Sequence, residues 1–315
     1  MSRSIVVVGS LNMDFVVTVN RLPAAGETTL GRDFQMIPGG KGANQACAAA
    51  KLAGPASSVR MIGRVGYDLF ADHLKASLAA AGVDVSAVHA TRSQPTGIAS
   101  IWVDSAGQNS IVVAPGANHE LRAEDVGAMR PLFRGAHFVM FQLESPIETV
   151  TAALAAARAE GARTILDPAP AVPLSSELLS SVDILTPNES EACLLLGRPV
   201  SRVTLTEAPS LGRELRKLGP GTVILKLGEQ GCYCLHEGGE IHSPGFTVDV
   251  RDTTAAGDTF NAGLAVALAD GCPIPDALQF ANAAAALSVT RLGAQASAPA
   301  RREVEEYLSR AQRAR

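Results

Sequence analysis

Hydrophobic residues along the chain fall into short runs rich in Val and Ile that alternate with longer stretches rich in Ala and Leu. Short apolar runs are typical of buried strands, and apolar residues three or four positions apart are typical of helices that pack on a sheet. This alternation favours an α/β fold of the doubly wound type, a mostly parallel sheet with helices on both faces. The predicted strands cover residues 5–8, 59–62, 137–143, 164–167, 184–186 and 222–227, and the predicted helices cover residues 43–53, 69–81, 147–160, 256–270, 274–290 and 301–312.

Two segments interrupt this alternation, residues 15–37 and residues 96–114. Both are rich in strand-forming residues and contain turn signals, and neither has a helix between its strands. They therefore predict a small separate antiparallel sheet, which is suited to act as a lid over a cleft or as a dimer surface. The chain contains no internal repeat or low-complexity linker, so we expect one domain, residues 1–315, that carries this lid as a subdomain.

Composition narrows the class of protein. The 27 Lys and Arg against 31 Asp and Glu give a net charge of −4, which argues against an electrostatic binder of nucleic acid. Five scattered cysteines, an odd number, indicate a reducing compartment without a disulfide framework. The first apolar run is too short for a signal peptide, and no run approaches the ~18 apolar residues of a membrane helix. We therefore expect a soluble, cytoplasmic protein with neither nucleic acid nor membrane as a partner.

The segment DTTAAGDTF, residues 252–260, is the most informative for chemistry. From Phe260 onward apolar residues recur at every fourth position, which predicts a helix that begins near Ala256. The small residues of its first turn leave backbone N–H groups accessible, and these groups together with the helix dipole form an anion site. Asp258 lies in this turn. Taken alone, the pattern is compatible with a capping acid and with a general base beside a phosphate cradle.

The glycine-rich segment GGKGANQ, residues 39–45, resembles a phosphate loop only in part. Gln35 occupies the position of the first Walker glycine, and Gly42 follows Lys41 where Ser or Thr is required. What remains is a glycine-lined helix entry with an ammonium and an amide. This arrangement suits a small polyhydroxylated ligand, although an ordinary strand-to-helix turn explains it equally well.

Polar residues also follow several predicted strands, in segments 9–14, 142–146, 186–191 and 226–231. In open α/β sheets ligands bind beyond the carboxyl ends of the strands, so Asn12 and Asp14 are placed to line a cleft. The segment TPNESE offers oxygen ligands suited to water-mediated binding of Mg²⁺. The segment KLGEQG is compatible with a loop that lines a nucleotide site, although this signal is weak on its own.

The sequence offers weaker signals for two other kinds of site. Cys232, Cys234 and His236 would share one face of a strand and, with His242, could form a zinc site, but their spacing matches no common zinc module. The chain contains no G-x-G-x-x-G motif, which argues against a dehydrogenase that binds a dinucleotide.

Taken together, the ordered segments resemble the ribokinase-like carbohydrate kinase family over nearly the whole chain. The matching segments are GSLNMD, GGKGANQA, GRVGYD, QLESP, DPAPA, TPNESEA, KLGEQG, DTTAAGDTFNAGL and TRLGAQAS. The resemblance implies a ribokinase-like α/β core with a β lid that also forms a homodimer contact. It implies ATP-dependent phosphorylation of a sugar's primary hydroxyl, giving ribose 5-phosphate if the sugar is ribose. The cofactors it implies are ATP, Mg²⁺ and a monovalent cation, expected to be K⁺.

The resemblance also implies roles for individual residues. Asp258 corresponds to the catalytic base, and the anion hole corresponds to Ala255, Ala256 and Gly257. The implied sugar contacts are Asn12, Asp14, Gly40, Lys41, Asn44, Glu144 and Asp258. The implied nucleotide contacts are Asn188, Lys226, Gly228, Glu229, Gln230, Gly231, Gly257 and Asn282. Glu191 is implied near Mg²⁺, through water, and the monovalent-cation loop is implied to comprise Asp252, Thr254, Ser288, Arg291, Gly293 and Ser297.

Two positions depart from the family pattern, because Lys226 and Asn282 replace the Thr and His of some members. Alternatives within the same fold are a kinase for another neutral acceptor, namely deoxyribose, a ketohexose or a nucleoside. An alternative from another class is a non-catalytic sugar-binding regulator.

Overall fold

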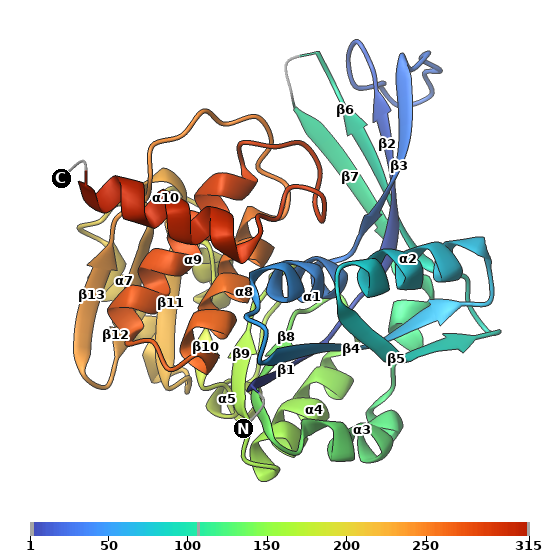
Figure 1. The fold of residues 1–315 in the computed structure, drawn as a ribbon. Coiled ribbons are helices and arrows are strands. Elements are labelled where there is room, and N and C mark those ends of the chain that lie inside the picture. Colours follow the sequence, from blue (N-terminus) through green and yellow to red (C-terminus); the bar gives the residue numbers. More distant parts are fainter. Residues whose placement is uncertain (1–2, 106–107, 314–315) are drawn as a thin grey trace.

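The computed structural model describes residues 3–105 and 108–313, and these residues form a large sheet, a small sheet and the helices that cover them (Figure 1). Nine described strands make up the large sheet, in the order β13-β12-β11-β10-β9-β8-β1-β4-β5. The pairings from β11 to β5 are parallel, and only β12 and β13 join antiparallel. The strands are β1 (Arg3–Val8), β4 (Ser57–Gly66), β5 (Val83–Thr91), β8 (Ala136–Phe141), β9 (Arg163–Leu166), β10 (Ile184–Leu185), β11 (Thr222–Lys226), β12 (Cys232–His236) and β13 (Gly239–Ser243).

Helices cover both faces of the large sheet because its strands are apolar on both sides. In β1, Ile5 and Val7 pack toward α1, α2, α8 and α9, whereas Val6 and Val8 pack toward α3, α4 and α5. Helices α6 and α7 cover β11 and β12 through a third cluster of buried residues. The helices are α1 (Lys41–Leu52), α2 (Leu69–Ala80), α3 (Val126–Phe133), α4 (Ile147–Ala159), α5 (Ser176–Ser180), α6 (Glu189–Leu195), α7 (Ala208–Lys217), α8 (Ala256–Ala269), α9 (Ile274–Ser288) and α10 (Arg301–Arg313). The predicted doubly wound fold is confirmed.

The small sheet protrudes from the core at the top of Figure 1 and has the order β3-β2-β6-β7. Its described strands are β2 (Asn12–Thr18), β3 (Asp33–Gly39), β6 (Gly97–Val103) and β7 (Asn109–Ala114); residues 106–107 of the predicted segment lie outside the described part. We call this sheet the lid sheet. Both hairpins are antiparallel, but β2 and β6 pair in parallel. The expectation of a wholly antiparallel sheet was therefore wrong at this pairing, because no turn connects the two strands and both leave the core at the same point, where Asn12 pairs with Gly97.

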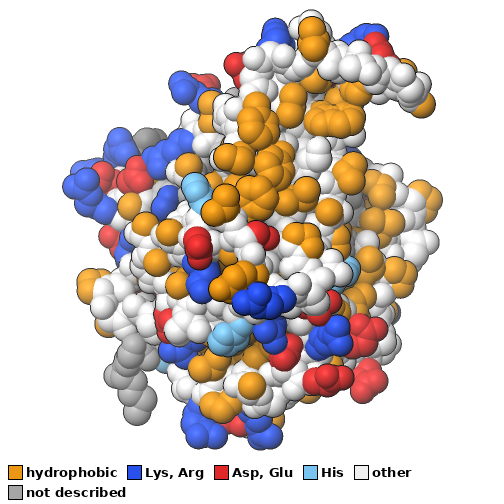
Figure 2. Space-filling view, turned by 90° about the vertical axis from the view of Figure 1, so that its right-hand side faces the viewer, with side chains coloured by type: hydrophobic (Ala, Val, Ile, Leu, Met, Phe, Trp, Pro, Cys, Tyr) orange, Lys and Arg blue, Asp and Glu red, His pale blue; other side chains and the backbone are white. Residues whose placement is uncertain are grey.

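The lid sheet exposes an unusual amount of apolar surface. Figure 2 shows hydrophobic side chains gathered over the protruding part of the molecule. Large apolar side chains of the lid strands are exposed, among them Phe34 (58%), Met36 (55%), Ile111 (52%) and Val112 (69%). None of the helices in the described ranges combines the length and the apolar character that a bilayer crossing requires.

Candidate active site

The start of α8 forms an anion site with an unusual backbone. Ala255, the residue before the helix, has φ +57° in the left-handed region, and it is the only residue other than glycine in the described ranges with a positive φ. Such a conformation costs about 1–3 kcal/mol and is typical of functional sites. The bond from the Thr259 N–H to the Ala255 carbonyl is the first of the helix. The amides of Gly257 and Asp258 precede it and belong to residues that line a cavity, so they are placed to meet an anion.

Asp258 is buried in the first turn of α8, with 5% of its surface exposed. Asn44 Nδ2 donates to its Oδ2 over 3.1 Å, and Gln45 Nε2 donates to its Oδ1 over 3.0 Å. Burial raises the pKa of Asp258 to about 6, Lys41 opposes this rise and Asp167 adds to it. A carboxylate with a pKa near the working pH is suited to accept a proton from an alcohol.

Asp258 belongs to a buried polar network. Gln45 Nε2 also donates to Asp167 Oδ2 over 3.1 Å, and Lys226 Nζ donates to Asp167 Oδ1 over 2.8 Å. Gln142 Nε2 donates to Gln45 Oε1 over 2.7 Å, which orients the Gln45 amide nitrogen toward the two carboxylates. The network therefore joins the Lys226 ammonium to the Asp258 carboxylate.

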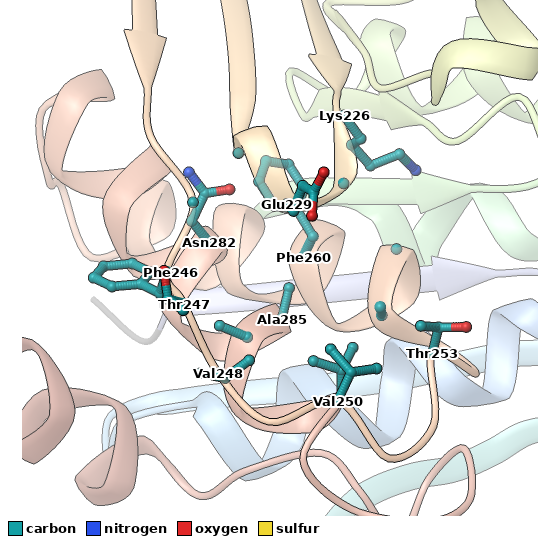
Figure 3. Close-up of a pocket in the computed structure, with 17 residues that line it drawn as sticks. Lys226, Glu229, Phe246, Thr247, Val248, Val250, Thr253, Phe260, Asn282 and Ala285 are labelled. Atoms are coloured by element: carbon teal, nitrogen blue, oxygen red, sulfur yellow. The ribbon is translucent and has the colours of Figure 1, made fainter. Parts of the chain in front are cut away.

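Two cavities meet at the start of α8. The first, about 400 Å³, is largely apolar, and Figure 3 shows Phe246, Val248, Val250 and Phe260 around it. The second, about 420 Å³, is polar and opens onto Asp258 and several further charged residues. Five residues line both cavities: Lys226, Gly228, Thr253, Ala256 and Gly257. An apolar cavity beside a polar one suits a ligand with a flat base at one end and phosphates at the other.

The predicted sugar residues come together between the large sheet and the lid sheet. Asn12 begins β2 and accepts at its Oδ1 from Asn118 Nδ2 over 2.7 Å. Glu144 follows β8, the neighbour of β1 in the large sheet, and its Oε2 accepts from the backbone N–H of Lys41 over 3.0 Å. Burial, with Glu144 nearby, raises the pKa of Asp14 to about 7.

Gly40 and Lys41 lie between the other predicted sugar residues, Asn12, Asp14 and Glu144, and Asp258. Gly40 has φ +89°, and a Cβ at this position would lie 2.7 Å from the backbone nitrogen of Asn12, so glycine is required where β3 turns into α1. Burial disfavours the Lys41 ammonium, but the carboxylates around it, led by Asp258, raise its pKa overall. Lys41 and Asp258 both line the polar cavity.

Most of the predicted nucleotide residues line one of the two cavities. Lys226, Gly228, Glu229, Gly231 and Asn282 line the apolar cavity, and Asn188 lines the polar one. Gln230 is the exception, because it lines neither cavity. Its side-chain nitrogen points to the carbonyl of Val203 over 3.5 Å.

Glu191 fits indirect metal binding better than direct coordination. Its two carboxylate oxygens accept from the backbone N–H and the side-chain Nδ2 of Asn188, over 2.7 and 2.9 Å, in a capping box at the start of α6. Burial raises the pKa of Glu191. No group of three or more His, Cys, Asp or Glu side chains in the described ranges is arranged to hold a metal ion. Mg²⁺ usually keeps several waters and takes phosphate oxygens as ligands. The single Glu191 carboxylate in the lining of the polar cavity is therefore compatible with the ion.

The predicted monovalent-cation residues form two segments that Asp252 holds together. Its Oδ1 accepts from the Thr254 N–H over 2.9 Å, and its Oδ2 accepts from the Gly293 N–H over 2.8 Å. Ser288 and Ser297 donate their hydroxyls to nearby carbonyls, which leaves hydroxyl oxygens to accept or coordinate. Arg291 pairs through its guanidinium with Glu303, so only its backbone carbonyl is a suitable cation ligand. This oxygen-rich loop fits a monovalent cation.

The zinc alternative finds no geometric support. Cys232 and Cys234 are buried under α9, and His242 pairs across the sheet with Tyr233, whose side chain lies on the opposite face of β12. Burial raises the pKa of Cys232 to about 12, so its thiol stays protonated at neutral pH.

Sequence reasoning missed Gln45, Asp167, Ser10, Asn118 and Gln142 as site residues. Gln45 lies in GGKGANQA, which the sequence analysis interprets as a glycine-lined helix entry, and Asp167 lies in DPAPA, which it names only as a family motif. Ser10 donates its hydroxyl to Glu144, and Asn118 holds Asn12. Ser10 and Gln142 also lie in matching segments, whereas Asn118 lies outside all of them. Each of the five acts through a partner far away along the chain, which no local pattern indicates.

Comparison with known proteins places the chain in a class. A model of the pfkB family carbohydrate kinases matches residues 2–301, and the chain belongs to this family. A ribokinase of Haemophilus influenzae is 39% identical over 312 residues, 99% of this chain and 100% of that protein. A ribokinase of Bacillus subtilis is 42% identical over 308 residues, 98% of this chain and 100% of that protein.

Solved structures agree with this assignment. The structure of an Arabidopsis thaliana ribokinase complexed with ribose and ATP matches with a TM-score of 0.87 and 36% identity, over 97% of this chain and 98% of that chain. A Thermotoga maritima ribokinase matches with the same TM-score and 38% identity, over 98% and 99% of the two chains. The family resemblance and the ribokinase-like fold are confirmed.

Proposed function

We propose that this protein is an ATP-dependent kinase that transfers the terminal phosphoryl group of ATP to the primary 5-hydroxyl of D-ribose, giving ribose 5-phosphate and ADP. The observation that carries the proposal is the buried Asp258 carboxylate, which Asn44 and Gln45 orient beside the free amides at the start of α8. The names of the full-length relatives support ribose as the acceptor. A deoxyribokinase of Salmonella typhi, 35% identical over 306 residues, keeps deoxyribose as an alternative.

In the proposed mechanism the sugar lies between the lid sheet and α8. Asn12 and Asp14 bind its hydroxyls, since an amide can donate and accept and a carboxylate can accept from two neighbouring hydroxyls. Asp258 accepts the proton of the primary hydroxyl as its oxygen attacks the terminal phosphorus in line. The amides around Gly257 stabilise the negative charge on the phosphoryl oxygens. Closure of the lid sheet would exclude water and so limit hydrolysis of ATP.

The ions have defined places in this proposal. Mg²⁺, when bound, neutralises charge on the nucleotide phosphates, and Glu191 would hold it through water. A monovalent cation, K⁺ by our expectation, would bind in the loop of Asp252, Thr254, Ser288, Arg291, Gly293 and Ser297. Because Asp252 lies just before the anion site, we infer that this cation fixes the shape of the loop and does not contact the sugar.

We further propose that the chain is one domain, that it acts in the cytoplasm and that it forms a homodimer through the lid sheet. All five cysteines lie in the described part and are free, as expected for a reducing compartment. The exposed apolar side chains of the lid strands support a contact between copies.

The proposal is tested by measuring ADP release with a panel of acceptors: ribose, deoxyribose, ketohexoses and nucleosides, first with K⁺ and then with Na⁺. We expect the highest kcat/KM with ribose, and a higher rate in K⁺. Preference for deoxyribose or another acceptor would replace ribose in the proposal and leave the kinase chemistry in place. Sugar binding without ADP release from any acceptor would instead identify a regulator.

A further inference from the structure

Lys226 occupies the boundary between the apolar and the polar cavity. Its side chain is 13% exposed and extends from the end of β11, and Figure 3 shows Nζ directed away from Phe246 and Val248. A Cβ on Gly257 would lie 3.3 Å from this nitrogen, so the ammonium lies against the first turn of α8. It is therefore next to the amides proposed to meet the transferred phosphoryl group.

The ammonium already has a partner in the structure. Lys226 Nζ is 2.8 Å from Asp167 Oδ1, and the Asp167 side chain is only 3% exposed. A buried ammonium without a counter-charge is strongly destabilising, so Asp167 keeps Lys226 charged in the absence of nucleotide. Burial opposes the charged form of Lys226, but Asp167 and Glu191 raise its pKa overall.

Asp167 also influences the Asp258 carboxyl, the proposed base. Its second oxygen accepts from Gln45 Nε2, the same nitrogen that donates to Asp258 Oδ1. A single amide group thus bridges the partner of Lys226 and the base. The negative charge of Asp167 adds to the rise in the pKa of Asp258, after the larger effect of burial.

We propose that Lys226 exchanges partners during turnover: its ammonium leaves Asp167 for the terminal phosphoryl oxygens of the nucleotide, and Asp167 then acts on the Asp258 base through Gln45. This inference rests on the proposed kinase function and assigns two residues within it. Lys226 becomes a catalytic residue that touches the phosphoryl group, and Asp167 becomes a positioning residue.

The exchange follows from electrostatics. A phosphoryl group in transfer spreads negative charge over its oxygens, and a compact ammonium at the helix start can stabilise that charge. When the ammonium moves, Asp167 loses its counter-charge while still sharing Gln45 with Asp258. Its field then favours protonation of Asp258 more strongly, at the step in which Asp258 takes up the proton of the hydroxyl.

The first test is the Lys226→Met variant, which removes the charge and keeps most of the side-chain length. We expect kcat to fall by about 10²–10³, the usual effect of removing one stabilising donor, with KM for ATP changed less than about tenfold. Inhibition by ADP with aluminium fluoride, a mimic of the phosphoryl group in transfer, should weaken in parallel. The control is Lys217→Met, which alters an exposed lysine in the last turn of α7 and should behave as the wild type.

The double variant Lys226→Met with Asp167→Asn separates catalysis from structure. It removes both charges of the Lys226–Asp167 ion pair, so neither partner is left without the other, and we expect folding to be preserved. We expect kcat to stay as low as in the single lysine variant. Recovery of kcat to the wild-type value would show that Lys226 only balances Asp167, and it would overturn the proposal.

The single variant Asp167→Asn tests the positioning role by its pH profile. Without the Asp167 charge the acid limb of kcat should move to lower pH, whereas Asp72→Asn, an exposed control in α2, should leave it in place. An unmoved limb would refute the action of Asp167 on the base. All variants are assayed with the acceptor that the wild type phosphorylates. Absence of any phosphorylation by the wild type would refute the proposed function, whereas an active wild type with an equally active Lys226→Met would refute only the exchange.

Discussion

As the proposed base, the Asp258 carboxyl would have to be ionised before it accepts a proton, and it would also have to bind that proton firmly once the hydroxyl attacks. Burial alone would favour the neutral acid and raise its pKa, whereas Lys41 and the two amide donors, Asn44 and Gln45, stabilise the ionised form. These opposing effects give Asp258 a pKa of about 6, so the carboxyl is ionised at neutral pH and is more basic than an ordinary aspartate.

The Asp258→Asn variant should lose the base while keeping the shape of the side chain. We expect kcat to fall by about 10²–10⁴ because general-base catalysis contributes in this range. Affinity for ATP should change little, since the cavity linings are otherwise unaltered. Coupled ADP release gives kcat, and calorimetric titration gives ATP affinity; Asp72→Asn serves as the control. Near-normal turnover would contradict the assignment of the base.

If Asp14 binds the sugar as proposed, sugar binding should depend on pH. Its pKa of about 7, raised by burial and then by Glu144, means that the carboxyl becomes neutral as the pH falls below 7. A neutral acid accepts fewer hydrogen bonds, so the KM for the sugar should rise by up to about tenfold for each pH unit below 7. The kcat should hold until the pH approaches 6, where Asp258 becomes protonated. Steady-state kinetics between pH 5.5 and 8 would show the two effects separately, and a KM that does not vary over this range would refute the role of Asp14.

At the scale of elements, substitutions of Ala255, the residue before α8, would show whether its left-handed backbone conformation matters for catalysis. Ala255 has φ +57°, which a β-branched residue adopts poorly. Ala255→Val should lower the free energy of unfolding by about 1–2 kcal/mol and lower kcat, because the amides of the anion site would shift. Ala255→Gly adopts this φ freely and should retain stability. Urea unfolding and ADP release measure both quantities; equal behaviour of the two variants would exclude the backbone as the cause.

Some elements were predictable from apolar runs and periodic spacing, and others were not. The strand at residues 5–8 and the helix at 256–270 were found from apolar runs and spacing, and both are confirmed. The strand β5 was missed because its edge position leaves only Val83, Ala87 and Val88 buried, and half-buried or exposed residues, most of them polar, interrupt the apolar run. The helix α6 is too short for a periodic signal, since tertiary packing rather than intrinsic propensity stabilises it.

The residues of the candidate site were also partly predicted from the sequence and partly missed. Asp258, Lys41 and Asn12 stood in motifs whose local pattern predicted an anion site, a helix entry and a strand end. Gln45 and Asp167 were missed because their contact joins positions 122 residues apart, and no local pattern encodes such a distance. The parallel pairing of β2 with β6 was missed for the same reason, since only tertiary structure brings the two hairpins together.

For the whole molecule, the mostly parallel sheet explains why the site lies where it does. Parallel strands end at one edge, and the polar residues after β1, β9 and β11 therefore gather there, beside the start of α8. The lid sheet leaves the core at the same edge, with Asn12 as the first residue of β2. In the proposed mechanism a sugar bound at this edge would contact both the lid sheet and Asp258, so a change in the lid sheet should affect binding of the sugar more than binding of the nucleotide.

The exposed apolar side chains of the lid sheet lead to the last prediction, on assembly. A sheet with exposed edges and apolar side chains is prone to pair with another copy, and Val112 in the edge strand β7 is 69% exposed. Sedimentation of the wild type should give the mass of a dimer. The Val112→Glu variant should give a monomer, because a carboxylate in the contact would have to be desolvated.

The activity of that monomer shows what the dimer contributes. If the contact between copies holds the lid sheet in place, the KM for the sugar should rise in Val112→Glu while the KM for ATP stays the same, since the nucleotide cavities lie away from the lid strands. Leu69→Glu, at an 86% exposed position in α2, places the same charge outside the lid strands and should remain dimeric. A wild type that sediments as a monomer, or a Val112→Glu variant that stays dimeric, would exclude the lid sheet as the contact between copies.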